Sequence, residues 1–220
     1  MSKADKPKLD SPGASLGTVE GWLARYIVFP MFCRTTAFEK ATSIFEAEGR
    51  RIEDLCGLFT PEQFTRRVLV PPLPGIEDNS RYWSAAMLVE HLVIVGNSVS
   101  KLLVFLSRCQ VPPFPLDIAG LKPGANHGIG VMPDFRRLLA EYPALVRDDL
   151  PRPPDAPRYA HPWFGELDIH QWHCLAAMHL RVHRRHLFLI RKGIKNEPPP
   201  AKSRSVFDEP VPDIPPATSG

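Results

Sequence analysis

The sequence has 220 residues, of which 44% are hydrophobic and 23% are charged, and its formal net charge is +3. These values are typical of one globular domain, and the length is short for two. The small net charge, without a long run of Lys and Arg, argues against a dedicated nucleic-acid surface. Four widely spaced cysteines and a polar N-terminus favour a reducing, cytoplasmic location over a secreted disulfide framework.

Both ends of the chain are expected to lie outside the folded domain. Residues 1–16 are polar and contain Pro and Gly, which predicts a flexible leader. Residues 194–220 contain seven prolines and show no helical or strand period, which predicts a disordered, Pro-rich tail. Prolines favour the extended polyproline II conformation, so docking of this tail to a partner is a second interpretation. The predicted domain spans residues 17–193.

Four long helices are predicted inside that domain. Their expected ranges, in chain order, are 35–59, 84–108, 133–147 and 167–191, with a shorter helix at 18–29 before them. Ser84 is expected to cap the second long helix, and Gly193 is expected to end the last one. Two long loops rich in Pro and Gly separate the helices, and no strands are predicted. The predicted fold class is therefore all-α, a four-helix bundle with long Pro-rich loops.

Residues 85–106 are long and apolar enough to suggest a membrane span. However, Glu90, His91, Asn97 and Lys101 lie within the stretch. A charged side chain near the centre of a bilayer costs about 2.5–3.5 kcal/mol on insertion scales. The sequence therefore predicts the buried helix of a bundle and no membrane contact.

Five of the eight histidines fall between residues 170 and 186, in the last predicted helix. His179 and His183 are one turn apart, so they share a face with Cβ atoms roughly 5–6 Å apart. That face carries the apolar stripe and is expected to point inward, whereas His170 and His173 are expected to lie off it. In the second long helix, His91 shares an inward face with Leu88, Val95 and Ser98, among others.

Two inward histidines on one helix and one on another can form a three-nitrogen metal site. Each imidazole would bind at about 2.0–2.1 Å, which leaves positions open for water or substrate. The His-x-x-x-His spacing also occurs in zinc proteases, but no Glu lies between His179 and His183, which disfavours a protease. A hydrogen-bonded histidine in a core stays an alternative. Against it, each unpaired buried imidazole would cost about 1–3 kcal/mol.

Two segments resemble the DinB-like superfamily. The stretch RYWSAAMLVEHLVIV (residues 81–95) is similar to the helix that carries the first metal-binding histidine of these proteins. The stretch HPWFGELDIHQWHCLAAMHLRVHRRHL (residues 161–187) is similar to their last helix, which carries the other two. The matching positions are His91, His179 and His183, and the resemblance covers residues 35–192.

The resemblance implies an up-down-down-up bundle, in many members a homodimer, with a divalent transition metal (Zn, Ni, Fe or Mn) between its helices. Members include metal-dependent hydrolases and thiol S-transferases that use a low-molecular-weight thiol such as bacillithiol or mycothiol. A small-molecule substrate is expected, and nucleic-acid binding is not.

The roles of other residues stay open at this stage. His186 lies one turn beyond His183 and could be a ligand, a partner of a ligand or a proton carrier, of which a non-ligand role is favoured. His161 is expected either to tie a turn or to pack near the mouth of the bundle. Trp83 and Trp172 are expected to anchor the core and, secondarily, to line a pocket with Leu88, Val95 and Ser98.

No convincing general base or thiol-binding motif stands out in the sequence. A second interpretation therefore remains: a non-catalytic helical stress or interaction protein. In that case its histidines would be metal-free, or would hold a metal that only clamps the bundle.

Overall fold

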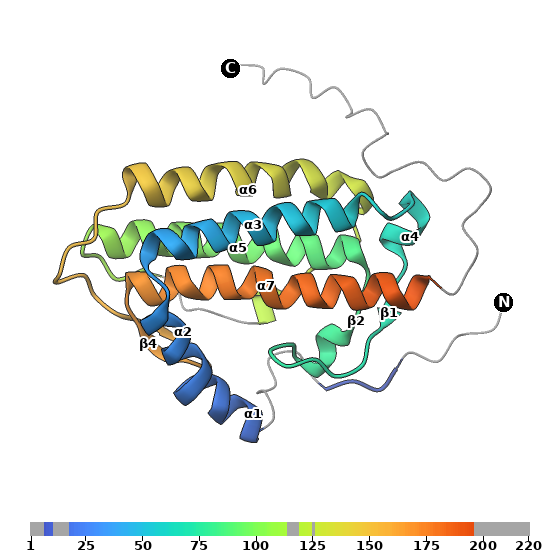
Figure 1. Ribbon diagram of the computed structural model, residues 1–220, viewed down its shortest axis with the longest axis horizontal. Helices are drawn as coiled ribbons and strands as arrows, with labels where there is room; N and C mark the ends of the chain where they lie inside the picture. Colours follow the sequence, from blue (N-terminus) through green and yellow to red (C-terminus); the bar gives the residue numbers. More distant parts are fainter. Residues whose placement is uncertain (1–6, 11–17, 114–118, 125, 196–220) are drawn as a thin grey trace, which may run out of the picture.

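The computed structural model describes residues 7–10, 18–113, 119–124 and 126–195. Its four main helices are α3 (Phe38–Cys56), α5 (Ala85–Ser107), α6 (Met132–Ala144) and α7 (Ile169–Ile194). α3 and α7 run in one direction, and α5 and α6 run in the other (Figure 1). The predicted all-α four-helix bundle is therefore confirmed.

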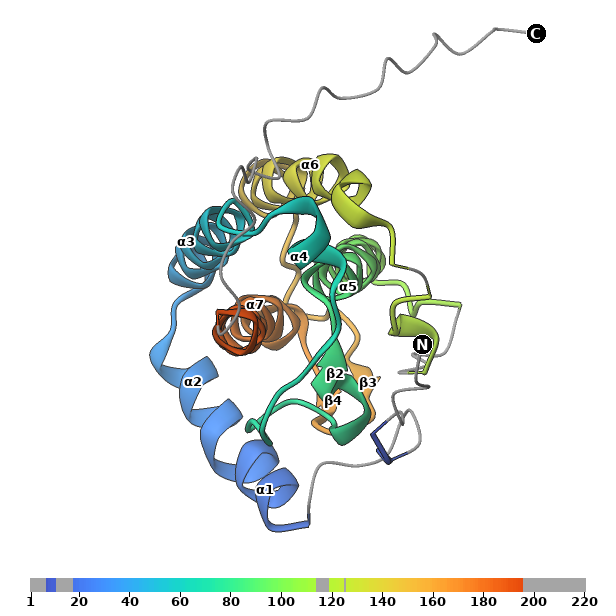
Figure 2. The same cartoon turned by 90° about the vertical axis from the view of Figure 1, so that its right-hand side faces the viewer.

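The helices pack in a ring in which α7 contacts α3 and α5, while α6 contacts α5 and α3 on the other side (Figure 2). α5 is apolar over most of its surface and meets the length and composition of a membrane span, although 44% of its most apolar window is buried inside the bundle. A helix that is apolar nearly all round fits the core of a bundle. Side chains of all four helices, among them Phe45, Leu92, Leu102, Phe135 and Leu187, form the core.

The caps set where the helices begin. Ser84 caps α5 as predicted, because its Oγ accepts a hydrogen bond from the Met87 backbone N–H at 3.1 Å. α7 begins two residues later than expected, where Asp168 and Gln171 form a reciprocal capping box.

The prediction that Gly193 ends the last helix is wrong, since α7 continues to Ile194. A Cβ atom at Gly193 would lie 2.5 Å from Cγ1 of Val68. The glycine therefore serves close packing of the β1 strand against the helix, and it does not terminate the helix.

The N-terminal helix is longer than predicted and is interrupted. It consists of α1 (Thr18–Leu23), a π-helical turn (Ala24–Val28) and α2 (Phe29–Thr35), which together are called the N-terminal arm. The arm lies beside the bundle, outside the ring of four main helices (Figure 2). Because the arm occupies residues up to 35, the first bundle helix starts at Phe38 and not at the predicted residue 35.

The loops contain short strands that the sequence did not predict. β1 (Val68–Leu69) pairs antiparallel with β2 (Tyr82–Trp83), and β3 (Tyr159–His161) pairs antiparallel with β4 (Gly165–Leu167). Strands of two or three residues are too short to show alternating hydrophobicity. A short helix, α4 (Pro61–Thr65), and three 3-10 turns (Asp78–Arg81, Ala119–Leu121 and Gly128–Val131) also lie in the connections.

The predicted leader and tail lie mostly outside the described residues. Of residues 1–16 only 7–10 are described, and of residues 194–220 only 194 and 195 are described. α6 ends at Ala144 and is extended by a π-helical turn, Leu145–Asp149, slightly past the predicted end of that helix.

His173 was expected off the inward face of the last helix, but its side chain is fully buried. α7 buries two faces because it contacts both α3 and α5. The His173 Nε2 atom lies 3.1 Å from the Phe38 carbonyl oxygen and 2.9 Å from Thr42 Oγ1, and Nδ1 lies 2.9 Å from the Tyr142 hydroxyl. A neutral ring with its proton on Nε2 satisfies this arrangement, with the Tyr142 hydroxyl donating to Nδ1.

We expect His173 to make the protein less stable in acid. Burial lowers the pKa of His173 to about 4, so between that value and the ordinary pKa near 6.5 the unfolded chain binds the extra proton. The free energy of unfolding should therefore fall as the pH drops through this window, by at most about 1.4 kcal/mol per pH unit for this residue. In His173→Gln, urea unfolding at several pH values should show a weaker pH dependence by that amount. Equal slopes in the two proteins would contradict the assignment.

Candidate metal centre

Three histidines from two helices meet between α5 and α7. One ligand atom each from His91, His179 and His183 lies within 4.8 Å of the others. The Nε2 atoms of His91 and His179 are 3.1 Å apart, and the rings of His179 and His183 have centroids 4.4 Å apart. The structure therefore brings together the three residues that helical spacing singled out.

The donor set fits a divalent transition-metal ion. Two nitrogens bound to one ion at about 2.0–2.1 Å, at tetrahedral or octahedral angles, lie roughly 2.9–3.4 Å apart. The observed 3.1 Å between the His91 and His179 nitrogens falls in this range, and it also allows an N–H···N hydrogen bond when no ion is bound. Nδ1 of His183 is buried without a hydrogen-bond partner among the described residues. An ion could satisfy such an orphaned ring nitrogen.

The His91 ring is held in one orientation by the loop after α5. Its Nδ1 lies 2.7 Å from the carbonyl oxygen of Leu121 and donates a hydrogen bond to it. In the neutral ring this leaves the lone pair of Nε2 directed at His179. Contacts of this kind set the tautomer of metal-binding histidines. Leu121 belongs to the 3-10 turn Ala119–Leu121, so this part of the long Pro-rich loop lies against the site.

All three rings are neutral at physiological pH. Burial lowers the pKa of His91 to about 4. Burial and the neighbouring histidines hold the pKa values of His179 and His183 well below their usual range. Neutral imidazoles are the form that binds metal ions, so protons do not compete with an ion at pH 7.

Trp83 and Lys122 complete one wall of the site. Sequence reasoning gave Trp83 only a secondary role in lining a pocket, and it did not assign Lys122 to the site. The Trp83 ring lies parallel to His183, with centroids 6.2 Å apart, and 5.1 Å from the His91 ring. The Lys122 ammonium group lies 5.5 Å from the centre of the Trp83 ring. The position of Trp83 directly before the Ser84 cap of α5 was the available signal, whereas nothing in the Pro/Gly-rich loop marked Lys122.

Lys122 is paired with a buried carboxylate. It forms an ion pair with Glu77, whose side chain is almost fully buried, and donates a hydrogen bond to Ser80 Oγ at 2.8 Å. Burial lowers the pKa of Lys122 to about 8. Its positive charge is one of the causes that lower the pKa values of His179 and His183. The site therefore has a buried lysine–glutamate ion pair beside the three histidines, with the lysine as the member nearer to Trp83.

His186 lies next to the three histidines without joining them. Its ring is fully buried, its centroid is 5.9 Å from that of His183, and neither ring nitrogen has a hydrogen-bond partner among the described residues. Burial lowers its pKa to about 3. His186 is not part of the group whose ligand atoms converge.

His161 ties the turn between β3 and β4. Its Nδ1 accepts hydrogen bonds from the backbone N–H groups of Trp163 and Phe164 at 3.1 and 3.4 Å. Burial lowers the pKa of His161 to about 4, and a charge on His161 would lower the pKa of His179. Its ring also packs on Trp172, with centroids 5.4 Å apart. The turn is therefore held close to the histidines.

The remaining predicted pocket residues are core or helix-surface side chains. Leu88 is fully buried in the core, and Val95 is partly buried against it. The Ser98 hydroxyl donates to the Ile94 carbonyl of its own helix at 2.8 Å. Glu90, the neighbour of His91, pairs instead with the exposed His127 at 3.3 Å.

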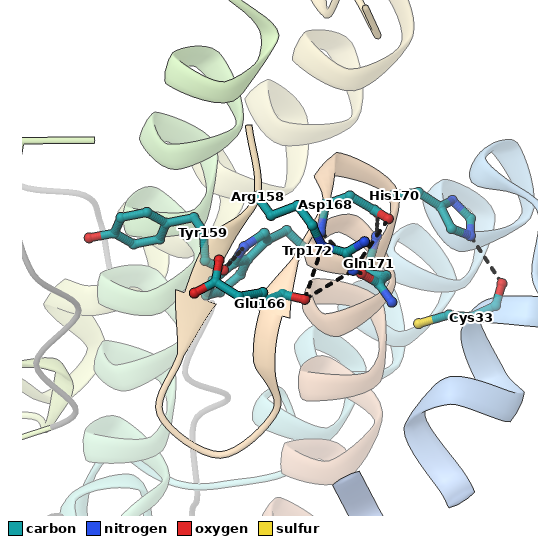
Figure 3. A network of polar contacts seen from close by, with 8 residues as sticks. All are labelled: Cys33, Arg158, Tyr159, Glu166, Asp168, His170, Gln171 and Trp172. Atoms are coloured by element: carbon teal, nitrogen blue, oxygen red, sulfur yellow. Dashed lines mark hydrogen bonds and ion pairs between the residues drawn. The ribbon is translucent and has the colours of Figure 1, made fainter. Parts of the chain in front are cut away.

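A network at the start of α7 fixes the position of the helix (Figure 3). Asp168 Oδ1 accepts from the Gln171 backbone N–H at 2.8 Å, and Arg158 donates to Gln171 Oε1 at 2.6 Å. Trp172 Nε1 donates to the Tyr159 carbonyl at 3.2 Å, which joins α7 to β3. On the other side, His170 Nε2 lies 3.0 Å from the Cys33 carbonyl of the arm. These contacts hold the start of the helix that carries His179 and His183, which lie about two to four turns further on.

We expect the charge of Lys122 to oppose cation binding. Replacing it with a neutral side chain in Lys122→Gln removes that repulsion and frees the Glu77 carboxylate. Zn²⁺ affinity measured by calorimetry should rise, roughly tenfold at low salt, and the gain should shrink at high salt. Exposed Lys101→Gln serves as the matched control and should leave affinity unchanged. Unchanged or weaker binding by Lys122→Gln would show that the lysine does not act on the ion.

A comparison with solved structures finds a likeness to a crystal structure described as TT2238, a four-helix bundle protein. The two chains are 23% identical, the match covers 69% of this chain and 98% of that one, and the TM-score is 0.45. No protein-family model and no curated protein matches the chain.

Proposed function

We propose that this protein is a DinB-like, metal-dependent enzyme that activates water or a low-molecular-weight thiol for reaction with a small molecule. The observation that carries the proposal is the convergence of three neutral imidazoles, His91, His179 and His183, from two helices. The sequence similarities at residues 81–95 and 161–187 support the same ligand set. The reaction would be hydrolysis or thiol S-transfer.

A divalent ion bound by the three histidines would supply Lewis acidity, which lowers the pKa of a water or thiol enough to give a nucleophile at neutral pH. Three protein ligands leave positions for such a group, as in catalytic zinc sites. Zn, Ni, Fe and Mn are all candidates, because selection among them depends on availability as well as affinity.

The chain's own residues orient and screen the site. The Leu121 carbonyl holds the His91 ring, and Trp83 covers one side of the cluster. Lys122 places a positive charge at the same wall, which favours a substrate that carries or develops negative charge. His186 offers two buried ring nitrogens near His183 that could hold a proton, although its low pKa keeps it neutral at pH 7.

Exposure determines the side from which a substrate would enter. His91 and His183 are buried, with 8% and 4% of their surface exposed, whereas His179 is only partly buried. The accessible side of the cluster is therefore the side of His179. A small molecule suits such an entrance better than a macromolecule does.

The deep burial of two of the three ligands also favours a second function. A metal held by buried histidines from α5 and α7 would clamp the two helices, as structural metal sites do. In that case the protein would be a helical stress or interaction protein without a reaction of its own.

We expect the protein, purified without a histidine tag, to bind about one equivalent of divalent transition metal. Changing His179 to Ala or His183 to Gln should reduce the bound metal, measured by elemental analysis, by roughly tenfold or more. His127→Ala is the control, because His127 is exposed and lies outside the cluster. Equal metal content in all four proteins would overturn the proposed centre.

Activity separates the enzyme from the clamp. The metal-loaded protein should accelerate either ester or amide hydrolysis or the coupling of a small thiol to an electrophile, and His179→Ala should abolish that rate. If metal raises the melting temperature but no such reaction is accelerated, the clamp is the function.

A further inference from the structure

The N-terminal arm exposes a continuous apolar face. Eleven large hydrophobic side chains are exposed among the described residues, and seven of them lie in the arm. They are Val19, Trp22, Leu23, Tyr26, Ile27, Val28 and Met31, with exposed fractions from 41% to 75%, and they are called the arm face. Soluble monomers rarely expose large contiguous apolar patches, and such patches commonly mark interaction surfaces.

The π-helical turn keeps this face on one side. An α-helix turns about 100° per residue, and a π turn contains about one more residue per turn. Through the turn at Ala24–Val28, the direction in which successive side chains point therefore lags about one residue behind that of a regular α-helix. As a result Met31 returns to the side of Trp22 and Ile27, while Phe29 and Cys33 face the bundle and are buried.

Contacts with the bundle prevent the arm from rotating about its own axis to bury this face. Glu20 accepts a hydrogen bond from the Gly75 backbone N–H at 2.8 Å, and the Phe29 ring packs on Phe164 with centroids 4.6 Å apart. At the end of the arm, His170 contacts the Cys33 carbonyl (Figure 3). Contacts along its length therefore hold the opposite side of the arm to the bundle.

The centre of the arm face has the chemistry of a proline-binding surface. The rings of Trp22 and Tyr26 are neighbours, with centroids 5.8 Å apart. The exposed Arg25 lies at the edge of the face, between the Tyr26 ring, whose centre is 5.2 Å from the guanidinium carbon, and Gly165 of β4. Aromatic side chains that lie side by side bind Pro-x-x-Pro segments in polyproline II conformation. The arginine adds a preference for acidic residues.

The C-terminal tail of the same chain has the complementary sequence. Pro212 and Pro215 form a Pro-x-x-Pro motif, with Pro210 and Pro216 beside it. Asp208, Glu209 and Asp213 supply negative charge, and residues 205–220 contain no Lys or Arg. In contrast, the arm presents Arg25 and Arg34 on its exposed surface.

The tail is long enough to reach the arm. Gly75 lies between α1 and α7. Its backbone N–H donates a hydrogen bond to Glu20 of α1, and a Cβ atom at Gly75 would lie 3.3 Å from Val182 of α7. α1 is therefore near the turn of α7 that contains Val182. α7 ends twelve residues later, at Ile194, about 18 Å along the helix. Residues 195–206 in extended form span roughly 35 Å, which covers this distance. A tethered segment also has a local concentration in the millimolar range, so weak contacts suffice.

We propose that residues 207–216 of the C-terminal tail dock on the arm face of their own chain, with the prolines on Trp22 and Tyr26 and the acidic residues near Arg25.

Nuclear magnetic relaxation of the full-length, ¹⁵N-labelled protein tests this directly. In the wild type, heteronuclear Overhauser effects of the tail amides from 207 to 216 should be clearly higher than those of 196–204. Tyr26→Ala and Pro212→Ser/Pro215→Ser should each lower them to the values of a free chain. Two matched controls should leave the Overhauser effects of residues 207–216 unchanged. The first is Leu58→Ala, at a residue beyond the end of α3 that is as exposed as Tyr26. The second is Pro198→Ser/Pro200→Ser, early in the tail. A uniformly mobile tail in the wild type would overturn the proposal.

A spin label distinguishes the chain's own tail from that of a second copy. With the exposed Cys109 changed to Ser, Ala217→Cys places the label beside the motif. The indole signal of Trp22, identified by its loss in Trp22→Phe, should be broadened at every protein concentration. Spin-labelled protein is also mixed with ¹⁵N-labelled protein that carries no spin label. Broadening only in this mixture would show that the tail docks on a second copy, and it would overturn the proposal. Equal binding of anionic lipid vesicles by the wild type and by Pro212→Ser/Pro215→Ser would show that the tail does not cover the arm face, and it would overturn the proposal as well.

Discussion

The contact between α5 and α7 is the interaction on which the candidate site depends. It removes three imidazole rings from water, and the same burial that makes them costly as unpaired groups keeps them neutral and able to bind an ion. The bundle geometry supplies the rest. One histidine comes from α5 and two come from successive turns of α7, so any change in the spacing of these helices would alter the distance between the nitrogens.

α7 contacts several other elements, and its five histidines face different ones of them. On one side His179, His183 and His186 face α5 and Trp83. On another side His173 links α3 and α6 through hydrogen bonds to Phe38 and Tyr142. His170 contacts the arm. Similar residues on one helix therefore differ in role according to the neighbour that each one meets.

Much of the fold followed from sequence, because the apolar period of the long helices and the Ser84 cap are local signals. Helical spacing also identified the three histidines, since the geometry of a helix fixes which side chains share a face. Other features were not visible in the sequence because they depend on contacts between distant segments. Gly193 packs against Val68, His173 is buried by α3, and Lys122 reaches the site from an irregular loop. The two-residue strands and the π turn in the arm leave no period of their own.

The hydrogen bond from His91 to Leu121 has a kinetic consequence. Through it the turn Ala119–Leu121 and the ring of a candidate metal ligand share one conformation. If the three histidines hold an ion as proposed, turning of the His91 ring during its release would break the bond to the loop. On that proposal the loop would slow the exchange of the ion as well as orient its ligand, so exchange could be slow even at ordinary affinity.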